Sequence, residues 1–136
     1  MTKYYLLVTL LLCASWYYFY RQRFIRGTVV RGYQQGAGLG AATANLDVSL
    51  ANFPKGLYAC TVLVNNKEYH GLLYYGINSV SNKDCLEAHL LQFDGDLYGK
   101  EIVVKRGKFL RPPKKFSSLL DLAEQIKDDI EAFKNA

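Results

Sequence analysis

The sequence predicts a mainly β domain, an antiparallel barrel or sandwich with a C-terminal helix, preceded by a transmembrane helix. Three observations predict this fold class. Short β-type runs follow one another between turn residues, with no helical pattern between them. Near the C-terminus, apolar residues recur at helical spacing. At the other end, residues 4–20 form an uncharged and largely apolar run.

The N-terminal run extends from Tyr4 to Tyr20. Tyrosines begin it and an aromatic cluster from Trp16 onward ends it, as in the aromatic belts of membrane-spanning helices. A cleaved signal peptide and a buried core helix are the alternatives, but bulky aromatic residues make a poor cleavage site. We therefore expect a transmembrane anchor and basic flank over residues 1–26, and a folded domain over residues 27–136.

The net charge of +5 is concentrated beside this run. Four basic residues and no acidic residue precede Gly27, which leaves thirteen basic against twelve acidic residues in the domain. We expect no nucleic-acid binding, because a binder spreads its basic residues over the face that meets phosphate. Arg21, Arg23 and Arg26 outweigh Lys3, so the positive-inside rule predicts a single-pass protein whose domain faces the cytoplasm or an organelle matrix.

Five runs in the domain have the composition of strands. We expect strands over residues 27–31, 56–64, 68–75, 86–93 and 100–110. The dipeptide Asn65-Asn66 is a turn signal that makes the second and third of these a hairpin. The C-terminal helix should pack on the barrel through one face, which consists of Leu119, Leu122, Ile126, Ile130 and Phe133.

A glycine-rich segment, residues 36–45, ends in the polar side chains of Thr43 and Asn45. Its spacing fits a dinucleotide fingerprint only formally, because no βαβ pattern surrounds it, and it lacks the Gly-Lys-Ser/Thr of a P-loop. A glycine-rich loop lets backbone N–H groups approach phosphate, and a hydroxyl can ligate Mg²⁺. A flexible hairpin loop is the alternative interpretation.

A second candidate lies in the run from Leu86 to Phe93. Strand alternation places Glu87 and His89 on one face of it. A carboxylate on a largely apolar face has a raised pKa, which suits a general base. A paired glutamate and a hydrogen-bonded structural histidine are the simpler interpretations.

Taken in order, these segments resemble the riboflavin kinase family. Gly40-Ala-Ala-Thr-Ala-Asn45 is similar to the family's Gly-x-Pro-Thr-Ala-Asn loop, and Pro54-Lys-Gly-Leu-Tyr58 to its Pro-x-Gly-Val-Tyr. The run from Glu87 to Phe93 is similar to Glu-x-His-Leu-Leu-x-Phe, and Asp96 to Gly99 matches Asp-Leu-Tyr-Gly. The resemblance extends from Gly27 to Lys134 and implies a six-stranded Greek-key barrel with a C-terminal α-helix.

The resemblance also implies an activity, the ATP-dependent phosphorylation of riboflavin to FMN with Mg²⁺, here in a membrane-tethered protein. The nucleotide would be bound by Gly36, Gly38, Gly40, Thr43 and Asn45. The last two would also ligate the metal ion. Glu87 would take the proton from the ribityl hydroxyl, and Arg111 and Phe116 would border the flavin.

Two positions differ from the family pattern. Ala42 stands where the family loop has proline, and Pro113 stands where glutamate often follows the Leu-Arg pair. Together with the anchor, they motivate an alternative hypothesis. In it, the chain is a catalytically degenerate subunit of a membrane protein complex, with a structural or flavin- or nucleotide-binding role.

Overall fold

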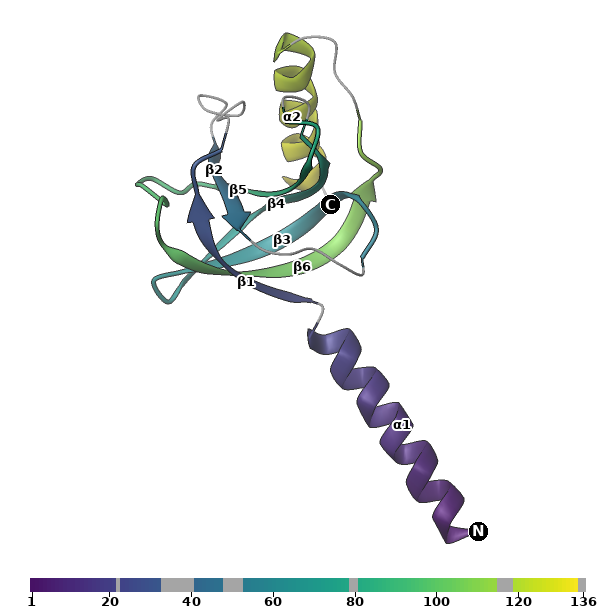
Figure 1. Cartoon of the computed structure of the whole chain (residues 1–136). Helices are drawn as coiled ribbons and strands as arrows, with labels where there is room; N and C mark the ends of the chain where they lie inside the picture. Colours follow the sequence, from purple (N-terminus) through teal and green to yellow (C-terminus); the bar gives the residue numbers. More distant parts are fainter. Residues whose placement is uncertain (22, 33–40, 48–52, 79–80, 115–118, 135–136) are drawn as a thin grey trace.

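A computed structural model of the chain describes residues 1–21, 23–32, 41–47, 53–78, 81–114 and 119–134. Two helices and six strands lie within these ranges (Figure 1). Their order is α1 (Thr2–Arg21), β1 (Phe24–Val30), β2 (Ala41–Asp47), β3 (Gly56–Val64), β4 (Lys67–Ile77), β5 (Asp84–Leu91), β6 (Glu101–Arg111) and α2 (Leu119–Lys134).

The strands form a closed antiparallel barrel in the order β1-β2-β5-β4-β3-β6. Strands β3, β4 and β5 are consecutive neighbours, and β2 lies beside β5 instead of β3. This arrangement of four strands is a Greek key. The predicted six-stranded barrel with a C-terminal helix is therefore confirmed.

The β3–β4 hairpin shows how local sequence sets the register. Asn65 and Asn66 have φ angles of 49° and 62°. Two consecutive residues in the left-handed region make the tight turn that matches the twist of a hairpin, and asparagine tolerates this conformation. Val64 then pairs with Lys67, and the pairing continues to Gly56 and Tyr75.

The barrel interior is the hydrophobic core. Alternate residues of each strand point into it, as the period of a strand requires. The residues of this cluster that come from β2 and β5 are Ala44, Leu46, Leu86, Ala88 and Leu90. Phe93 also packs against the cluster, because Gln92 has a φ of 56° and breaks the alternation that would have turned Phe93 outward.

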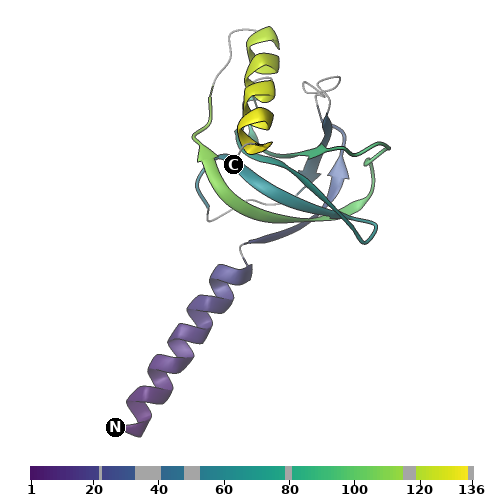
Figure 2. The ribbon, with the colours of Figure 1, turned by 180° about the vertical axis from the view of Figure 1, so that it is seen from behind.

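Helix α2 packs against the outside of the barrel (Figures 1 and 2). Its Asp129 binds Arg111 on β6, and its Phe133 ring lies 6.4 Å from the His70 ring on β4, measured between centroids. Ile130 and Phe133, which belong to the predicted apolar face, are half-buried. The helix therefore covers part of the outer face of the strands.

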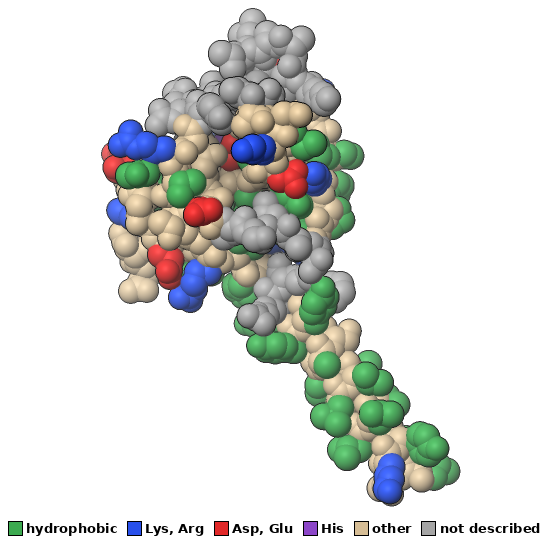
Figure 3. Space-filling model, in the orientation of Figure 1, with side chains coloured by type: hydrophobic (Ala, Val, Ile, Leu, Met, Phe, Trp, Pro, Cys, Tyr) green, Lys and Arg blue, Asp and Glu red, His purple; other side chains and the backbone are tan. Residues whose placement is uncertain are grey.

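Helix α1 extends away from the barrel, and hydrophobic side chains are exposed along its length (Figures 1 and 3). In the described ranges, however, no helix combines the length and the apolar character that crossing a membrane requires. The predicted transmembrane anchor is therefore not supported, and the predicted single-pass localisation, facing the cytoplasm or an organelle matrix, is wrong.

The error has a physical reason in the composition of α1. A membrane span needs about 20 predominantly apolar residues. The aliphatic stretch between Tyr5 and Ser15 supplies less than half of that length. The tyrosines on both sides of it carry hydroxyl groups, so the features interpreted as interfacial belts lower the hydropathy of the whole helix.

Candidate active site

The polar residues of β2 and β5 lie directly opposite one another. The register pairs Thr43 with His89 and Asn45 with Glu87. Opposite residues in an antiparallel pair place their side chains on the same face, with Cβ atoms about 4.5–5.5 Å apart. Because alternate residues such as Ala88 face the barrel interior, these four polar side chains lie on the outer face. We call Thr43, Asn45, Glu87 and His89 the outer quartet.

The β2 half of the outer quartet belongs to a strand and not to a loop. The sequence favours a loop over residues 36–45, but residues 41–45 pair with β5 along their whole length. Asn45 pairs in addition with Val30 on β1. The candidate nucleotide-binding residues Gly36, Gly38 and Gly40 lie outside the described residues, as does Phe116.

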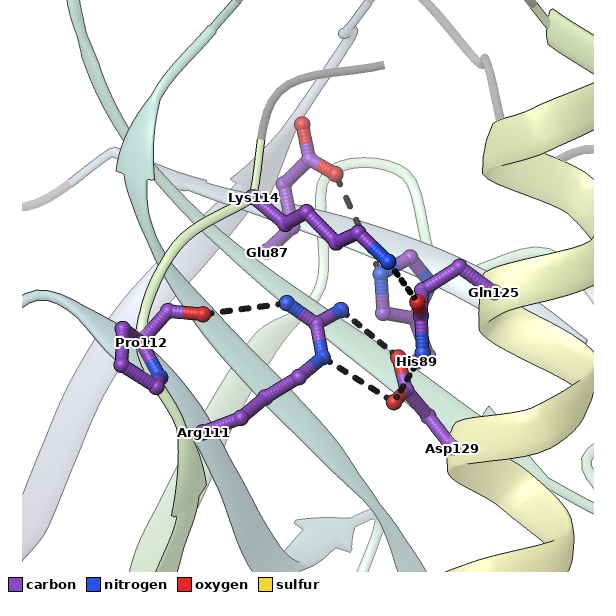
Figure 4. Close-up of polar contacts among 7 residues, drawn as sticks. All are labelled: Glu87, His89, Arg111, Pro112, Lys114, Gln125 and Asp129. Atoms are coloured by element: carbon purple, nitrogen blue, oxygen red, sulfur yellow. Dashed lines mark hydrogen bonds and ion pairs between the residues drawn. The ribbon is translucent and has the colours of Figure 1, made fainter.

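The Glu87 side chain is partly buried and keeps part of its surface exposed. Its side chain is 21% exposed, and its Oε2 lies 4.0 Å from Nε2 of His89 (Figure 4). Burial raises the pKa of the Glu87 carboxyl above its ordinary value. A carboxylate with a raised pKa is a stronger base, and the remaining exposure leaves it accessible to a substrate.

His89 is the most enclosed member of the outer quartet. Its side chain is 9% exposed, and Nδ1 lies 3.1 Å from the Thr43 hydroxyl. Burial lowers the pKa of the His89 imidazole to about 4, and the nearby Asp129 carboxylate opposes this shift only in part. The ring is therefore neutral at pH 7 and acts as a hydrogen-bonding group.

Two glycines make room for the outer quartet. A Cβ atom on Gly32 would lie 2.0 Å from Nδ2 of Asn45, so the absence of a side chain there leaves space for the Asn45 amide. A Cβ atom on Gly71 of β4 would lie 2.2 Å from the carbonyl oxygen of His89. The glycine at position 71 thus allows β4 and β5 to approach closely beside the site.

An ion-pair cluster ties α2 to the barrel beside Glu87 and His89 (Figure 4). Arg111 donates to both carboxylate oxygens of Asp129, from Nε at 3.0 Å and from Nη2 at 2.7 Å. Gln125 donates to Oδ1 of Asp129 at 3.0 Å, and Lys114 donates to Oε1 of Gln125 at 2.7 Å. The sequence singles out Arg111 as a flavin neighbour, but its partner on α2 was missed.

Tyr74 is a further polar residue that the sequence analysis missed. The register places it opposite Glu87 on β5 and opposite Leu57 on β3, and Leu57 in turn is paired with Arg111. Burial raises the pKa of the Tyr74 phenol, with smaller contributions from Cys85 and Glu87. The row from Glu87 through Tyr74 toward Arg111 runs across the outer face. Only the strand order brings these positions together.

The outer quartet contains oxygen atoms of the kind that ligate Mg²⁺. Among the described residues, no three His, Cys, Asp or Glu side chains gather closely enough to hold a metal ion. Thr43 and Asn45 offer a hydroxyl and an amide oxygen, which are hard ligands of the kind Mg²⁺ accepts beside water and substrate phosphates. The donor set therefore fits magnesium that arrives with a nucleotide.

Comparison with known proteins places this barrel in a family. The model of the family described as "Flavokinase: Riboflavin kinase" matches residues 19–136. The chain belongs to the riboflavin kinase family. The match includes both strands of the outer quartet and helix α2, so the resemblance seen in the separate sequence motifs is confirmed.

Individual relatives of this riboflavin kinase family member are similar over most of the chain. The trifunctional protein RibF/MnmA of Mycoplasmoides gallisepticum is 40% identical over 114 residues, which are 80% of this chain and 17% of that protein. Riboflavin kinase from Trypanosoma brucei has a similar fold, with a TM-score of 0.53 and 25% identity, over 82% of this chain and 77% of that one.

A second solved structure is more similar in fold. A macrolide-efflux protein from Streptococcus pneumoniae aligns with a TM-score of 0.71 and 29% identity, over 83% of this chain and 38% of that one. The matched segment spans 17–47% of the length of eight curated relatives. Those relatives therefore contain long regions that this chain does not match.

Proposed function

We propose that this chain is a riboflavin kinase, which transfers the γ-phosphoryl group of ATP to the ribityl hydroxyl of riboflavin and forms FMN and ADP. The observation that carries the proposal is the outer quartet. It sets a half-buried carboxylate, Glu87, directly across the strand pair from Asn45, with the Thr43 hydroxyl one pair further along. Membership of the riboflavin kinase family supports the same reaction.

In this reaction Glu87 acts as the general base. Its carboxylate takes the proton from the ribityl hydroxyl while the hydroxyl oxygen forms a bond to the γ-phosphorus. The bond from that phosphorus to the bridging oxygen breaks, and its electrons leave with ADP. The raised pKa of Glu87 improves the acceptance of a proton, and its partial exposure lets the hydroxyl reach it.

Thr43 and Asn45 hold the phosphate end of the nucleotide. Magnesium, bound there together with ATP, would neutralise charge on the phosphate oxygens. The two side chains orient the nucleotide relative to Glu87, because all three project from the same face of paired strands. We further propose that Arg111 and the glycines at 36, 38 and 40 contribute to flavin and nucleotide binding, and that Phe116 borders the flavin.

The test is a direct assay of FMN formation. Purified chain is given riboflavin, ATP and Mg²⁺, and FMN is separated and measured by its fluorescence. We expect Glu87→Gln to lower kcat by roughly 100- to 10,000-fold, because the variant keeps the shape of the side chain and loses the base. In the unchanged chain, the acid limb of kcat/KM against pH should lie above 4.5, the ordinary pKa of the group, since burial raises the pKa of Glu87.

A matched control is Glu68→Gln, which changes an exposed carboxylate on β4. Its rate should stay within about twofold of the unchanged chain, as for other surface substitutions. If Glu87→Gln keeps the full rate, Glu87 is not the base. If both riboflavin and ATP bind and no FMN forms, the chain is a binding protein and the kinase proposal fails.

A further inference from the structure

The Tyr74 side chain lies along the outer face of β4 instead of standing away from it. A Cβ atom on Gly76, two residues further along the strand, would lie 2.3 Å from the hydroxyl oxygen of Tyr74, 2.5 Å from its Cζ and 3.0 Å from its Cε1. The end of the phenol therefore occupies the space that a side chain at position 76 would fill. Gly76 is buried, whereas Tyr74 keeps part of its surface exposed. The phenol thus covers the backbone of β4 and presents its remaining surface outward.

The outer face around Tyr74 is apolar. Leu73 and Tyr58 belong to the core cluster, so strand alternation places their neighbours Leu72 and Leu57 on the outer face. Leu72 comes two residues before Tyr74 on β4, and Leu57 lies opposite Tyr74 on β3. Both leucines are buried, with 1% and 4% of their surface exposed. Tyr74 is therefore the partly exposed member of an apolar group on the outside of the barrel.

Polar groups stand at both ends of the row that contains Tyr74. Glu87 lies opposite it on β5, and Cβ atoms of such a pair are about 4.5–5.5 Å apart. Beyond Leu57 the row ends at Arg111 on β6, which Figure 4 shows together with Glu87. Sites for small ligands combine apolar and aromatic surface with a few polar groups that fix orientation. Riboflavin has the matching chemistry, because a planar isoalloxazine ring carries a chain of hydroxyl groups.

We propose that the Tyr74 ring stacks against the isoalloxazine ring of riboflavin and thereby selects a planar aromatic substrate whose ribityl hydroxyl reaches Glu87. This inference rests on the proposed kinase function. Stacked aromatic rings attract one another beyond the area that they bury. At about 3.3 Å per residue, the phenol end over Gly76 lies about 6–7 Å along the strand from the Tyr74–Glu87 pair, a distance that the ribityl chain spans.

The first experiment uses the fluorescence of riboflavin bound to the full chain, with and without magnesium-ADP. A phenol stacked on an excited flavin quenches its emission, whereas a plain benzene ring does not. We expect bound riboflavin to be quenched in the unchanged chain and to recover most of its emission in Tyr74→Phe. The affinity should stay within about twofold, because the stacked ring is kept. Equal quenching in both proteins, or no binding of riboflavin, overturns the proposal.

The second experiment measures the affinity that the Tyr74 ring supplies. Tyr74→Leu keeps an apolar side chain and should weaken riboflavin binding about three- to tenfold, the contribution of one aromatic stack. The matched control is Tyr17→Leu, which changes an exposed tyrosine of α1 and should have an effect below about twofold. Equal riboflavin affinities of the two variants would contradict the proposal.

The same variant distinguishes the flavin from the adenine ring of the nucleotide. Calorimetry with magnesium-ATP should show that Tyr74→Leu changes the affinity for the nucleotide by less than about twofold, because the stack belongs to riboflavin. A loss of nucleotide affinity with riboflavin affinity unchanged would assign the Tyr74 ring to adenine and overturn the proposal.

Gly76→Ala tests whether the position of the ring matters. The three atoms nearest to the added Cβ all belong to Tyr74, so the methyl group must lift the phenol. We expect Gly76→Ala to weaken riboflavin binding about three- to tenfold, and by less than about twofold in a Tyr74→Leu background. An equal loss in both backgrounds, or no loss in either, means that the flat placement of the ring does not serve binding and overturns the proposal.

Steady-state kinetics separate this inference from the proposed function. A residue that stacks on the substrate acts on binding, so Tyr74→Leu should raise the KM for riboflavin about three- to tenfold and leave kcat within about twofold. A lower kcat at unchanged KM would show a disturbance of Glu87 and count against stacking. Quenching that depends on Tyr74 without FMN formation would support the stacking and refute the kinase function. FMN formation with quenching and KM independent of Tyr74 would do the reverse.

Discussion

Strands β2 and β5 present two faces that differ in burial and in polarity. On the inner face, Ala44, Ala88 and Leu90 are fully buried in the core of the barrel. On the outer face, Thr43 and Glu87 keep part of their surface exposed and carry polar groups. Neighbouring residues in the sequence therefore belong in turn to the core and to the candidate site. A slip of one residue in the strand register would exchange the two faces.

The two faces also differ in the sign of their contribution to stability. Burying apolar side chains inside the barrel stabilises the fold, by about 25 cal/mol for each Å² removed from water. Burying the ionisable groups of Glu87 and His89 opposes their charged forms, which is why the pKa of the carboxyl is raised and that of the imidazole lowered. Burial of the apolar side chains on the inner face therefore offsets the cost of burying ionisable groups on the outer face.

The largest expected effect comes from the inner face. Leu90→Ala removes a fully buried side chain from the core and should lower the free energy of unfolding by about 2–5 kcal/mol. Urea denaturation measures this loss, and magnesium-ATP affinity is measured on the protein that remains folded. We expect that affinity to change by less than about threefold, because the Leu90 side chain belongs to the core cluster on the face of β5 opposite the outer quartet.

Leu91, the half-buried residue next to Leu90, provides the control for the loss of stability. Leu91→Ala alters the residue that follows Leu90, and its smaller buried area should make the loss of stability smaller. If Leu90→Ala abolished nucleotide binding while leaving the urea midpoint unchanged, the division of labour between the two faces would be wrong.

The next effect concerns the attachment of α2 to the outer face. The Arg111–Asp129 pair is bidentate, and its side chains are 22% and 9% exposed. Asp129→Asn should lower the free energy of unfolding by about 1–3 kcal/mol, less than for a fully buried pair because water still reaches Arg111. The comparison is the Arg26–Glu101 pair, in which the Arg26 side chain is 71% exposed and the Glu101 side chain 61%. Glu101→Gln breaks this pair and should lower the free energy of unfolding by at most about 1 kcal/mol.

Thermal or urea unfolding of the two variants makes this comparison. Equal losses for Asp129→Asn and Glu101→Gln would show that the Arg111 contact does not hold the helix. A loss confined to Asp129→Asn, accompanied by weaker riboflavin binding, would connect the attachment of α2 with the flavin side of the site.

Much of the barrel could be predicted from local sequence, but β2 could not. The runs around β3, β4 and β5 are rich in residues that favour strands and are bounded by clear turns. The run Ala41-Ala-Thr-Ala-Asn45 has little intrinsic preference for a strand and follows a segment, residues 36–40, in which three of five residues are glycine. It becomes a strand because β5 and β1 pair with it on both sides, a tertiary effect that composition does not carry.

The sequence indicates candidate residues for the site, but it does not indicate their arrangement. Alternation alone indicates that Glu87 and His89 share a face. That Thr43 stands opposite His89 depends on the Greek-key order, which brings β2 beside β5 across a long separation in sequence. The Arg111–Asp129 contact likewise depends on where α2 lies. At the N-terminus, the aromatic residues at both ends of α1 favour a membrane span, but the aliphatic stretch between them is too short for one.

The smallest expected effect on stability is that of a substitution at Gly32. This substitution tests whether the candidate site can be changed without changing the fold. An alanine Cβ would lie 2.0 Å from Nδ2 of Asn45, so the Asn45 side chain must move, while the fold loses no core contact. Gly32→Ala should therefore leave the free energy of unfolding within about 0.5 kcal/mol and weaken magnesium-ATP binding by about three- to tenfold. In an Asn45→Ala background the same change should have no effect on binding, because the displaced amide is absent. A loss of binding that persists in that background would mean that Gly32 acts through its own main chain. The space it leaves would then not be what sets the position of Asn45.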